Sequence, residues 1–184
     1  VVISELSVEP GSSSVYNFTV SLEGSDTYYT AFEIDLTLPD GLSVATTAKG
    51  DLRVSMVKPS LYPYEIEEQE NEDGEIVEVK AYTHQLSKAM TGPNRLKVIV
   101  LSFENELFTK TSDNLFKVYV QASPYLKPGD VEIGVKALLV TPDEVKYYPE
   151  EYTSTSVQAS ATSTLSLKVS ADNKFGTCIL PFGY

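Results

Sequence analysis

Residues 32–44 read FEIDLTLPDGLSV, and this stretch decides the fold class. Its apolar residues fall at every second position, so an extended chain places them on one side and the polar residues on the other. The apolar set is Phe32, Ile34, Leu36 and Leu38, and the polar set is Glu33, Asp35 and Thr37. The run ends in Pro39-Asp40-Gly41, a turn sequence in which Pro presets φ and Gly tolerates positive φ. The pattern predicts a half-buried strand followed by a tight turn.

The same alternation, bounded by turn residues, recurs along nearly the whole chain. We expect strands at residues 2–8, 15–22, 30–38, 42–46, 52–57, 76–83, 96–103, 115–122 and 131–140, with a late pair near 165–169 and 176–180. A helical face sustained over three turns is found nowhere without an interrupting Pro or Gly, and the best short helical candidate is residues 83–90. Many strands without helices between them predict an all-β fold, antiparallel and arranged as a sandwich or barrel.

The composition is that of a globular chain. A length of 184 residues fits one ordinary domain with a real core. With 42% hydrophobic and 22% charged residues, the chain lacks the composition of a disordered segment. The longest apolar run, residues 98–101, is far shorter than the roughly 18 residues needed to cross a bilayer. No membrane insertion of this segment is expected.

The charge and the cysteine count exclude several kinds of site. A net charge of −12 disfavours nucleic acid and anionic lipid as partners, because both bind through Lys and Arg. The single cysteine, Cys178, excludes an internal disulfide framework and any multi-cysteine metal site. We interpret it as a small buried hydrophobe.

Glu33 and Asp35 are the one pair of carboxylates that suggests catalysis. They lie two residues apart on one strand face, about 7 Å between Cα atoms. Paired carboxylates near that separation can perform acid and base chemistry on a glycosidic bond. The sequence nearby offers no apolar pocket that would raise the pKa of one of them. A solvated strand face is the better interpretation.

An acidic segment, EIEEQENEDGEIVE, occupies residues 65–78. Its Asp73-Gly74 pair is a strong hairpin-turn signal, and its apolar residues are too few to bury both arms. We expect a protruding hairpin or long loop. Glu70, Glu72 and Asp73 are weak candidates for Ca²⁺, which favours clustered carboxylates, but they lack the ligand spacing of a Ca²⁺ loop. No cofactor is expected otherwise.

Tyrosine is the main aromatic residue, with twelve copies and no tryptophan. Exposed Tyr rings stack on sugars or anchor protein interfaces, whereas cross-strand packing is the alternative role. The candidate ligand-binding residues are Tyr28, Tyr29, Tyr62, Tyr64, Tyr147 and Tyr148. His84 is the only histidine, and without a nucleophile motif around it we interpret it as structural or solvent-facing.

Two stretches resemble cohesin-type modules and related carbohydrate-binding-module-type sandwiches. The first is VEPGSSSVYNFTVSLEGSDTYYTAFEIDLTLPDGLSV at residues 8–44, and the second is RLKVIVLSFENELFTKTSDNLFKVYVQASPYLKPGDVEIGVKALLVTPD at residues 95–143. The resemblance covers roughly residues 1–148 and rests on pattern, since no dockerin-contacting residue matches position by position. It implies an antiparallel jelly-roll β-sandwich of about nine strands in a secreted or surface-attached bacterial protein. Such modules bind proteins or glycans and do not catalyse.

The C-terminal part has a different character. We expect the sandwich to span residues 1–152 and a Ser/Thr-rich linker or edge strand to follow at residues 153–164, which read TSTSVQASATST. Residues 165–184, LSLKVSADNKFGTCILPFGY, are predicted to form a β extension or the truncated start of a second β module.

The leading functional hypothesis is a non-catalytic interaction module that binds a protein or polysaccharide at the cell surface. The chain opens without a signal peptide, and we expect an exported protein whose leader is absent from this sequence. The second hypothesis is a structural spacer within a larger surface protein. The third is a glycosidase that uses Glu33 and Asp35, which requires a concave pocket with convergent carboxylates.

Overall fold

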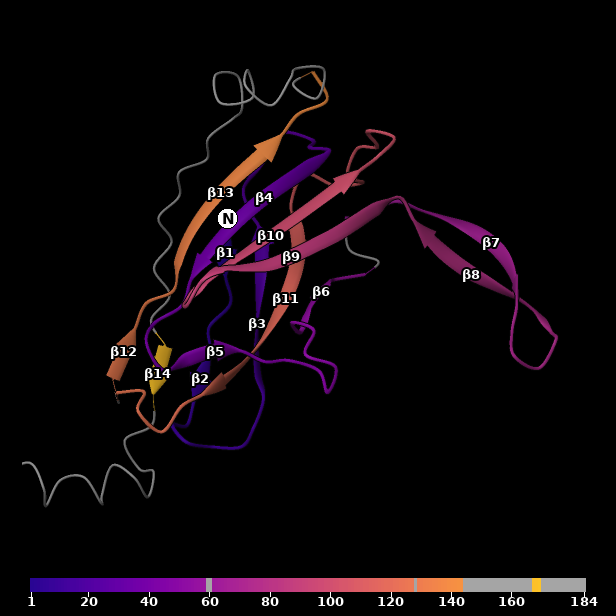
Figure 1. The fold of residues 1–184 in the computed structure, drawn as a ribbon. Helices are drawn as coiled ribbons and strands as arrows, with labels where there is room; N and C mark the ends of the chain where they lie inside the picture. Colours follow the sequence, from indigo (N-terminus) through magenta and orange to yellow (C-terminus); the bar gives the residue numbers. More distant parts are fainter. Residues whose placement is uncertain (59–60, 128, 144–166, 170–184) are drawn as a thin grey trace, which may run out of the picture.

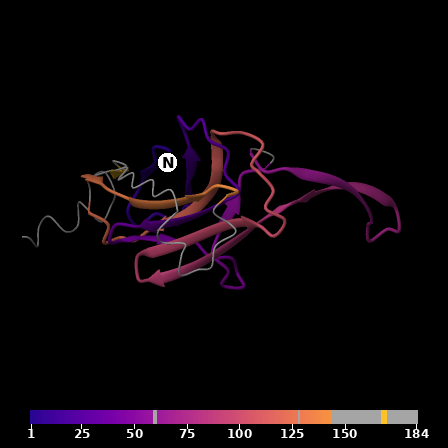
Figure 2. The ribbon, with the colours of Figure 1, turned by 90° about the horizontal axis from the view of Figure 1, so that it is seen from above.

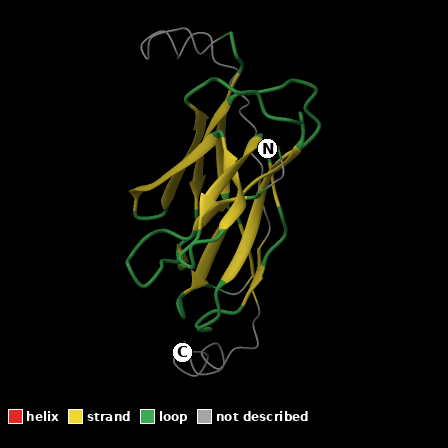
Figure 3. Cartoon of the chain, turned by 90° about the vertical axis from the view of Figure 1, so that its right-hand side faces the viewer, coloured by secondary structure: helices red, strands yellow, loops and turns green. Residues whose placement is uncertain are grey.

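The structure is a computed structural model that describes residues 1–58, 61–127, 129–143 and 167–169. The described residues form strands and loops without a helix (Figure 3). Accordingly, no helix suited to crossing a membrane occurs among them. The all-β prediction is confirmed.

Two antiparallel sheets pack face to face as a jelly-roll sandwich (Figures 1 and 2). One sheet has the order β1-β3-β11-β5, with β6 also paired to β11; the strands are β1 Val2–Ile3, β3 Tyr16–Leu22, β11 Asp113–Ala122, β5 Leu42–Val44 and β6 Val54–Met56. The other has the order β13-β4-β10-β9; the strands are β13 Gly134–Val140, β4 Ala31–Thr37, β10 Arg95–Ser102 and β9 His84–Gly92. The five and four strands of these sheets agree with the predicted number of about nine.

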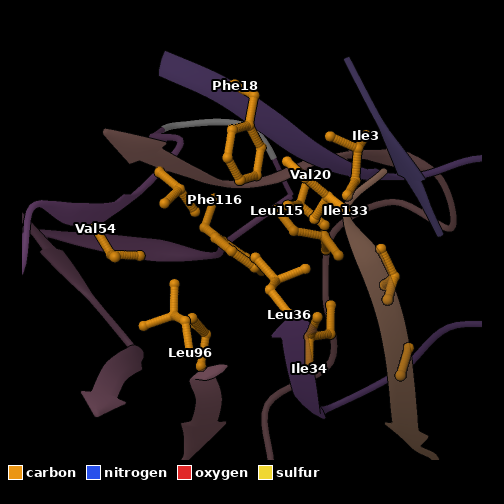
Figure 4. Close-up of a cluster of buried hydrophobic side chains, with 14 of the residues drawn as sticks. Ile3, Phe18, Val20, Ile34, Leu36, Val54, Leu96, Leu115, Phe116 and Ile133 are labelled. Atoms are coloured by element: carbon orange, nitrogen blue, oxygen red, sulfur yellow. The ribbon is translucent and has the colours of Figure 1, made fainter. Parts of the chain in front are cut away.

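Strand β4 occupies the position that its alternation predicts. It lies between β10 and β13 and pairs with both, and its inward side chains Phe32, Ile34 and Leu36 are fully buried. They meet the inward side chains of β3 and β11 across the sandwich, where Phe32 stacks on Phe116 with ring centroids 5.8 Å apart. Figure 4 shows this cluster, with Ile34 and Leu36 below Phe116 and Phe18 above it. Burying these apolar faces is the main favourable term for folding.

Two smaller elements complete the described fold. A three-stranded sheet has the order β12-β14-β2; its strands are β12 Gly129–Val131, β14 Leu167–Val169 and β2 Ser7–Val8. β14, which belongs to the predicted C-terminal extension, runs antiparallel to β12 and parallel to β2. A two-stranded hairpin, β7 Tyr64–Glu70 and β8 Ile76–Tyr82, extends away from the sandwich (Figure 1). The remaining residues of the predicted linker and extension, with Cys178, lie outside the described residues.

The structure corrects some predicted elements. The helical candidate at residues 83–90 is wrong, because this segment forms β9 and pairs antiparallel with β10 across a turn at residues 92–95. Its apolar spacing imitated a helix, but His84, Leu86 and Lys88 follow a strand alternation in which every second residue is less exposed. Residues 2–8 and 131–140, each expected as one strand, are divided into two pairs of shorter strands, β1 with β2 and β12 with β13.

A bulge in β11 is held by a tyrosine from a loop. The register of β11 against β3 shifts between Asn114 and Phe116, so Leu115 and Phe116 are both buried. The hydroxyl of Tyr62 donates to the Leu115 carbonyl at 2.6 Å, and the Tyr62 ring packs edge-on against Phe108. Burial raises the pKa of the Tyr62 hydroxyl far above its ordinary value. This loop residue therefore fastens the segment before the hairpin to the core.

The turn that follows β4 needs its glycine for two reasons. Gly41 has a φ of +89°, and a Cβ at this position would lie 2.8 Å from the Cα of Leu126. The amide of Ser123 also donates to the Gly41 carbonyl at 2.7 Å, which keeps the two backbones close. Only glycine, which has no side chain, allows this close contact with the backbone of Leu126.

Gly41→Ala should lower the free energy of unfolding by about 2–4 kcal/mol, since it adds a strained φ and a backbone clash. Gly50→Ala is the matched control, because Gly50 has the same φ of +89° with open space around it. It should cost about 1 kcal/mol. Urea unfolding measures both variants, and equal losses would show that the contact with Leu126 is unimportant.

Tyr62→Phe should cost about 1 kcal/mol of unfolding free energy, since it removes one buried hydrogen bond. The cost stays modest because the Leu115 carbonyl also accepts from the Val57 amide at 3.2 Å. Tyr28→Phe, at a half-exposed ring, should change stability by less than about 0.5 kcal/mol. Thermal and urea unfolding of the two variants test this, and no difference between them would contradict the role of the Tyr62 hydroxyl.

Candidate functional site

The outer face of the sheet β13-β4-β10-β9 is a candidate interaction surface. Its side chains line up in cross-strand rows, one of which contains Leu138, Glu33, Ile99 and Ser87, and the next Lys136, Asp35, Lys97 and Ala89. Each of these side chains is exposed or half-buried, and on β4, β10 and β13 its neighbours along the strand are mostly buried. The face thus places half-buried aliphatic side chains beside charges of both signs.

The two carboxylates of the opening stretch lie on this outer face. Lys97, on the neighbouring strand, donates a hydrogen bond to Glu33, and its Nζ lies 3.8 Å from Asp35 Oδ2. The hydrogen bond with Glu33 raises the pKa of Lys97 above its ordinary value. One lysine therefore neutralises part of the charge of both acids. Their environment is a salt-bridged, half-buried strand face.

The candidate tyrosines divide into three groups. Tyr28 and Tyr64 are 49% and 40% exposed and remain accessible. Tyr29 and Tyr62 are 7% and 1% exposed, so their rings belong to the core and cannot stack on a ligand. Both are core residues that lie in loops, so their role is core packing and differs from the cross-strand packing considered as the alternative. Tyr147 and Tyr148 lie outside the described residues.

Three aromatic residues outside the predicted set shape the surface. Phe103 and Tyr125 are 77% and 86% exposed in the turns that follow β10 and β11. Tyr82 packs against Tyr64 across the hairpin, with ring centroids 5.5 Å apart. The exposure of Phe103 and Tyr125 could have been predicted from their position in the sequence. Both follow the last residue of a strand's apolar alternation, so no core-facing position remains for them.

The base of the hairpin is ordered by stacked cations and rings. Lys80 lies over the Tyr64 ring at 4.4 Å and Lys58 over the Tyr82 ring at 4.2 Å. At the tip, the side-chain oxygen of Asn71 accepts from the amides of Asp73 and Glu75 at 3.0 and 2.9 Å. Asn71 therefore organises the turn together with Gly74, whose φ is +80°. The sequence prediction of a hairpin at Asp73-Gly74 located the turn but missed Asn71.

The hairpin carries its charges into solvent. Every side chain of β7 is exposed, as are most of those of β8. Among the residues that the structure describes, no group of three or more His, Cys, Asp or Glu side chains is arranged to hold a metal ion. Ca²⁺ binding by Glu70, Glu72 and Asp73 stays a prediction from the sequence.

His84 is a buried member of the aromatic core. Its Nε2 lies 2.9 Å from the Thr30 carbonyl and its Nδ1 lies 3.1 Å from the Thr83 hydroxyl, so a neutral ring donates through Nε2 and accepts through Nδ1. Its ring packs on Phe108 at 4.9 Å and on Tyr62 at 5.7 Å. Burial lowers the pKa of His84, an effect partly opposed by hydrogen bonds at Thr30 and Glu106 and by the Glu106 charge. Of the two roles that the sequence left open, structural and solvent-facing, the buried His84 has the structural one.

Comparison with known proteins identifies the fold. No family model matches the chain, and no curated protein matches it. Among solved structures, the CaDoc0917–CaCohA2 complex matches with a TM-score of 0.61 and 11% identity over 92% of this chain and 97% of that chain. The fold is cohesin-like.

Two further cohesins give the same result. The sixth cohesin of scaffoldin B from Acetivibrio cellulolyticus, solved in complex with the Cel5 dockerin, matches with a TM-score of 0.58 and 12% identity over 92% of this chain and 96% of that chain. The cohesin module of a family 33 glycoside hydrolase from Clostridium perfringens matches with a TM-score of 0.52 and 11% identity over 92% and 97%. At these identities the likeness establishes the cohesin-like sandwich fold.

The lowered pKa of His84 predicts a specific pH dependence. A histidine whose pKa is lowered by folding binds fewer protons in the folded than in the unfolded state, so its contribution is complete above about pH 6.5 and is lost as the pH falls below that value. The free energy of unfolding of the wild type should therefore fall more steeply than that of His84→Gln between about pH 7 and 5. The difference in slope is at most about 1.4 kcal/mol per pH unit, the limit for one proton. Parallel urea-unfolding curves for the two proteins across this range would contradict the assignment.

Proposed function

We propose that the chain is a non-catalytic interaction module that binds a protein partner through the outer face of the sheet β13-β4-β10-β9. The observation that carries this proposal is the composition of that face, where the half-buried side chains of Ile99 and Leu138 lie among Glu33, Lys97 and other charged residues. Aliphatic contact area surrounded by polar side chains is the arrangement of protein interfaces. Four hydrogen-bonded strands form this surface.

The similarity to cohesins supports a protein partner. Two of the similar structures are complexes, one of them with the Cel5 dockerin and the other between CaDoc0917 and CaCohA2. A partner of the dockerin type is therefore the first to test. An exported, cell-surface setting is part of the proposal and follows from the resemblance of the sequence to modules of such proteins.

The salt-bridged environment of Glu33 and Asp35 argues against the glycosidase alternative. Acid and base catalysis on a glycosidic bond needs two carboxylates placed around a bound sugar, with one pKa raised by its surroundings. Here both acids lie on a sheet face and contact the same lysine, so they are engaged in a salt bridge.

Binding of purified dockerin modules, the Cel5 dockerin among them, and of soluble polysaccharides should be measured by biolayer interferometry. Ile99→Arg, which places a bulky charge at the centre of the face, should weaken the binding of a protein partner at least about tenfold. Gln121→Arg is the matched control, since Gln121 is an exposed residue of β11 in the opposite sheet. It should leave the affinity within about twofold.

Each outcome separates the candidate functions. Equal loss in both variants would place the binding surface elsewhere. Binding of a polysaccharide in place of a protein would make the module a glycan binder. Absence of binding to every dockerin and polysaccharide would favour the spacer alternative.

A further inference from the structure

A cleft of about 410 Å³ lies between the base of the β7–β8 hairpin and the turn that follows β10. Its volume falls within the range of ligand pockets in proteins. The hairpin contributes Glu65 and Glu67, and the turn contributes Phe103, Glu104 and Glu106. This surface is separate from the centre of the sheet face described above, and the inference drawn from it does not depend on the proposed function.

The charges around the hairpin base are segregated by strand alternation. Glu65 and Glu67 point to the face of the hairpin that borders this cleft, whereas Lys80 points to the opposite face. On that opposite face, Lys58 and Lys80 line a second cleft of about 560 Å³ and lie over the rings of Tyr82 and Tyr64. Lys58 and Lys80 therefore lie on the side of the hairpin opposite to the cleft that contains the glutamates.

The four glutamates of the cleft have no basic partner within it. No Lys, Arg or His lines the cleft, and none of the four carboxylates forms an ion pair with another residue in the described part of the chain. The wall thus combines exposed negative charge with the aromatic ring of Phe103.

Phe103 stands in a turn whose backbone is fixed. The hydroxyl of Ser102 accepts from the amides of Glu104 and Glu106, each at 3.3 Å, and the next buried residue, Phe108, donates its amide to the Tyr29 carbonyl at 2.8 Å. Although Phe103 is a large apolar residue, its side chain is 77% exposed. An aromatic ring held in water beside a cleft is typical of a contact surface.

The residues that line the cleft indicate which kind of ligand fits it. The glutamates are not grouped as metal ligands within the described residues, so an inorganic cation does not match their arrangement. A guanidinium or ammonium group on a long stem does match, because it pairs with carboxylates and with the face of an aromatic ring at the same time. We infer that the cleft binds an extended, basic segment of a protein partner, with an arginine or lysine side chain placed between Phe103 and the glutamates.

The position of the cleft suits a segment that continues from the sheet face. Gln85, an exposed residue of β9, lines the cleft and pairs with Leu101 of β10 in the four-stranded sheet. A basic tail or loop of a partner seated on that sheet would reach the cleft directly. The same cleft would also accept a basic peptide alone.

NMR titration of the ¹⁵N-labelled chain with the peptide acetyl-Gly-Arg-Gly-Arg-Gly-amide tests the inference. We expect amide shifts at residues 65–67, 81–85 and 103–106, and none with the matched peptide in which glutamate replaces arginine. Phe103→Ala should weaken binding of the arginine peptide about threefold, because the ring contact is lost. The double variant Glu104→Gln with Glu106→Gln should weaken this binding at least about fivefold. These residues are exposed, and the dispersion of the spectrum reports that each variant is folded.

Glu70→Gln with Glu72→Gln is the charge-matched control, because it removes the same two charges at the hairpin tip outside the cleft. This variant should bind the arginine peptide within about 1.5-fold of the wild type, apart from general screening effects. Equal weakening in the tip variant would overturn the inference in favour of diffuse attraction. Shifts spread over the whole acidic surface, shifts at the cleft with millimolar CaCl₂ alone, or no shifts at millimolar peptide would also overturn it.

Discussion

The pairing of β4 on both of its edges is the constraint on which the rest of the structure depends. Because β10 and β13 hold it in a fixed register, the two sides of β4 have fixed and different surroundings. A shift of one residue would move Phe32 and its inward neighbours into water and the acids into the core, so the register is specified strongly. The alternation thus determines both the packing against β11 and the charge pattern of the outer face.

The outer face and the acidic cleft are built on the same frame. β9 and β10 contribute side chains to the sheet face, Gln85 of β9 lies at its border with the cleft, and β10 ends at Ser102, whose hydroxyl holds the turn that carries Phe103. The segment leading to the hairpin is fastened to the core through Tyr62 and the bulge in β11. Elements that project into solvent are therefore positioned by buried contacts, which keeps the surface pre-formed.

The distribution of charge is more informative than its total. A net charge of −12 disfavours some classes of partner but says nothing about where a partner binds. Lys97 partly neutralises the acids of the sheet face, whereas Lys58 and Lys80 stack on tyrosine rings and leave the far side of the hairpin base negative. Cation–π contacts and strand alternation together separate the positive from the negative side chains within a few residues of the hairpin base.

The sequence by itself determined the all-β class, β4 with its turn at Gly41, the hairpin near Gly74 and the solvated position of Glu33 and Asp35. These features follow from local alternation and turn chemistry, which are properties of neighbouring residues. Only the tertiary structure decided that residues 84–92 form a strand, that Tyr29 and Tyr62 are core residues, and that Lys97 joins the two acids. It also decided which glutamates meet Phe103 in one cleft. In each of these cases the partner is distant in the chain, and pairing between distant segments is set by how the two sheets pack and by no pattern within either segment.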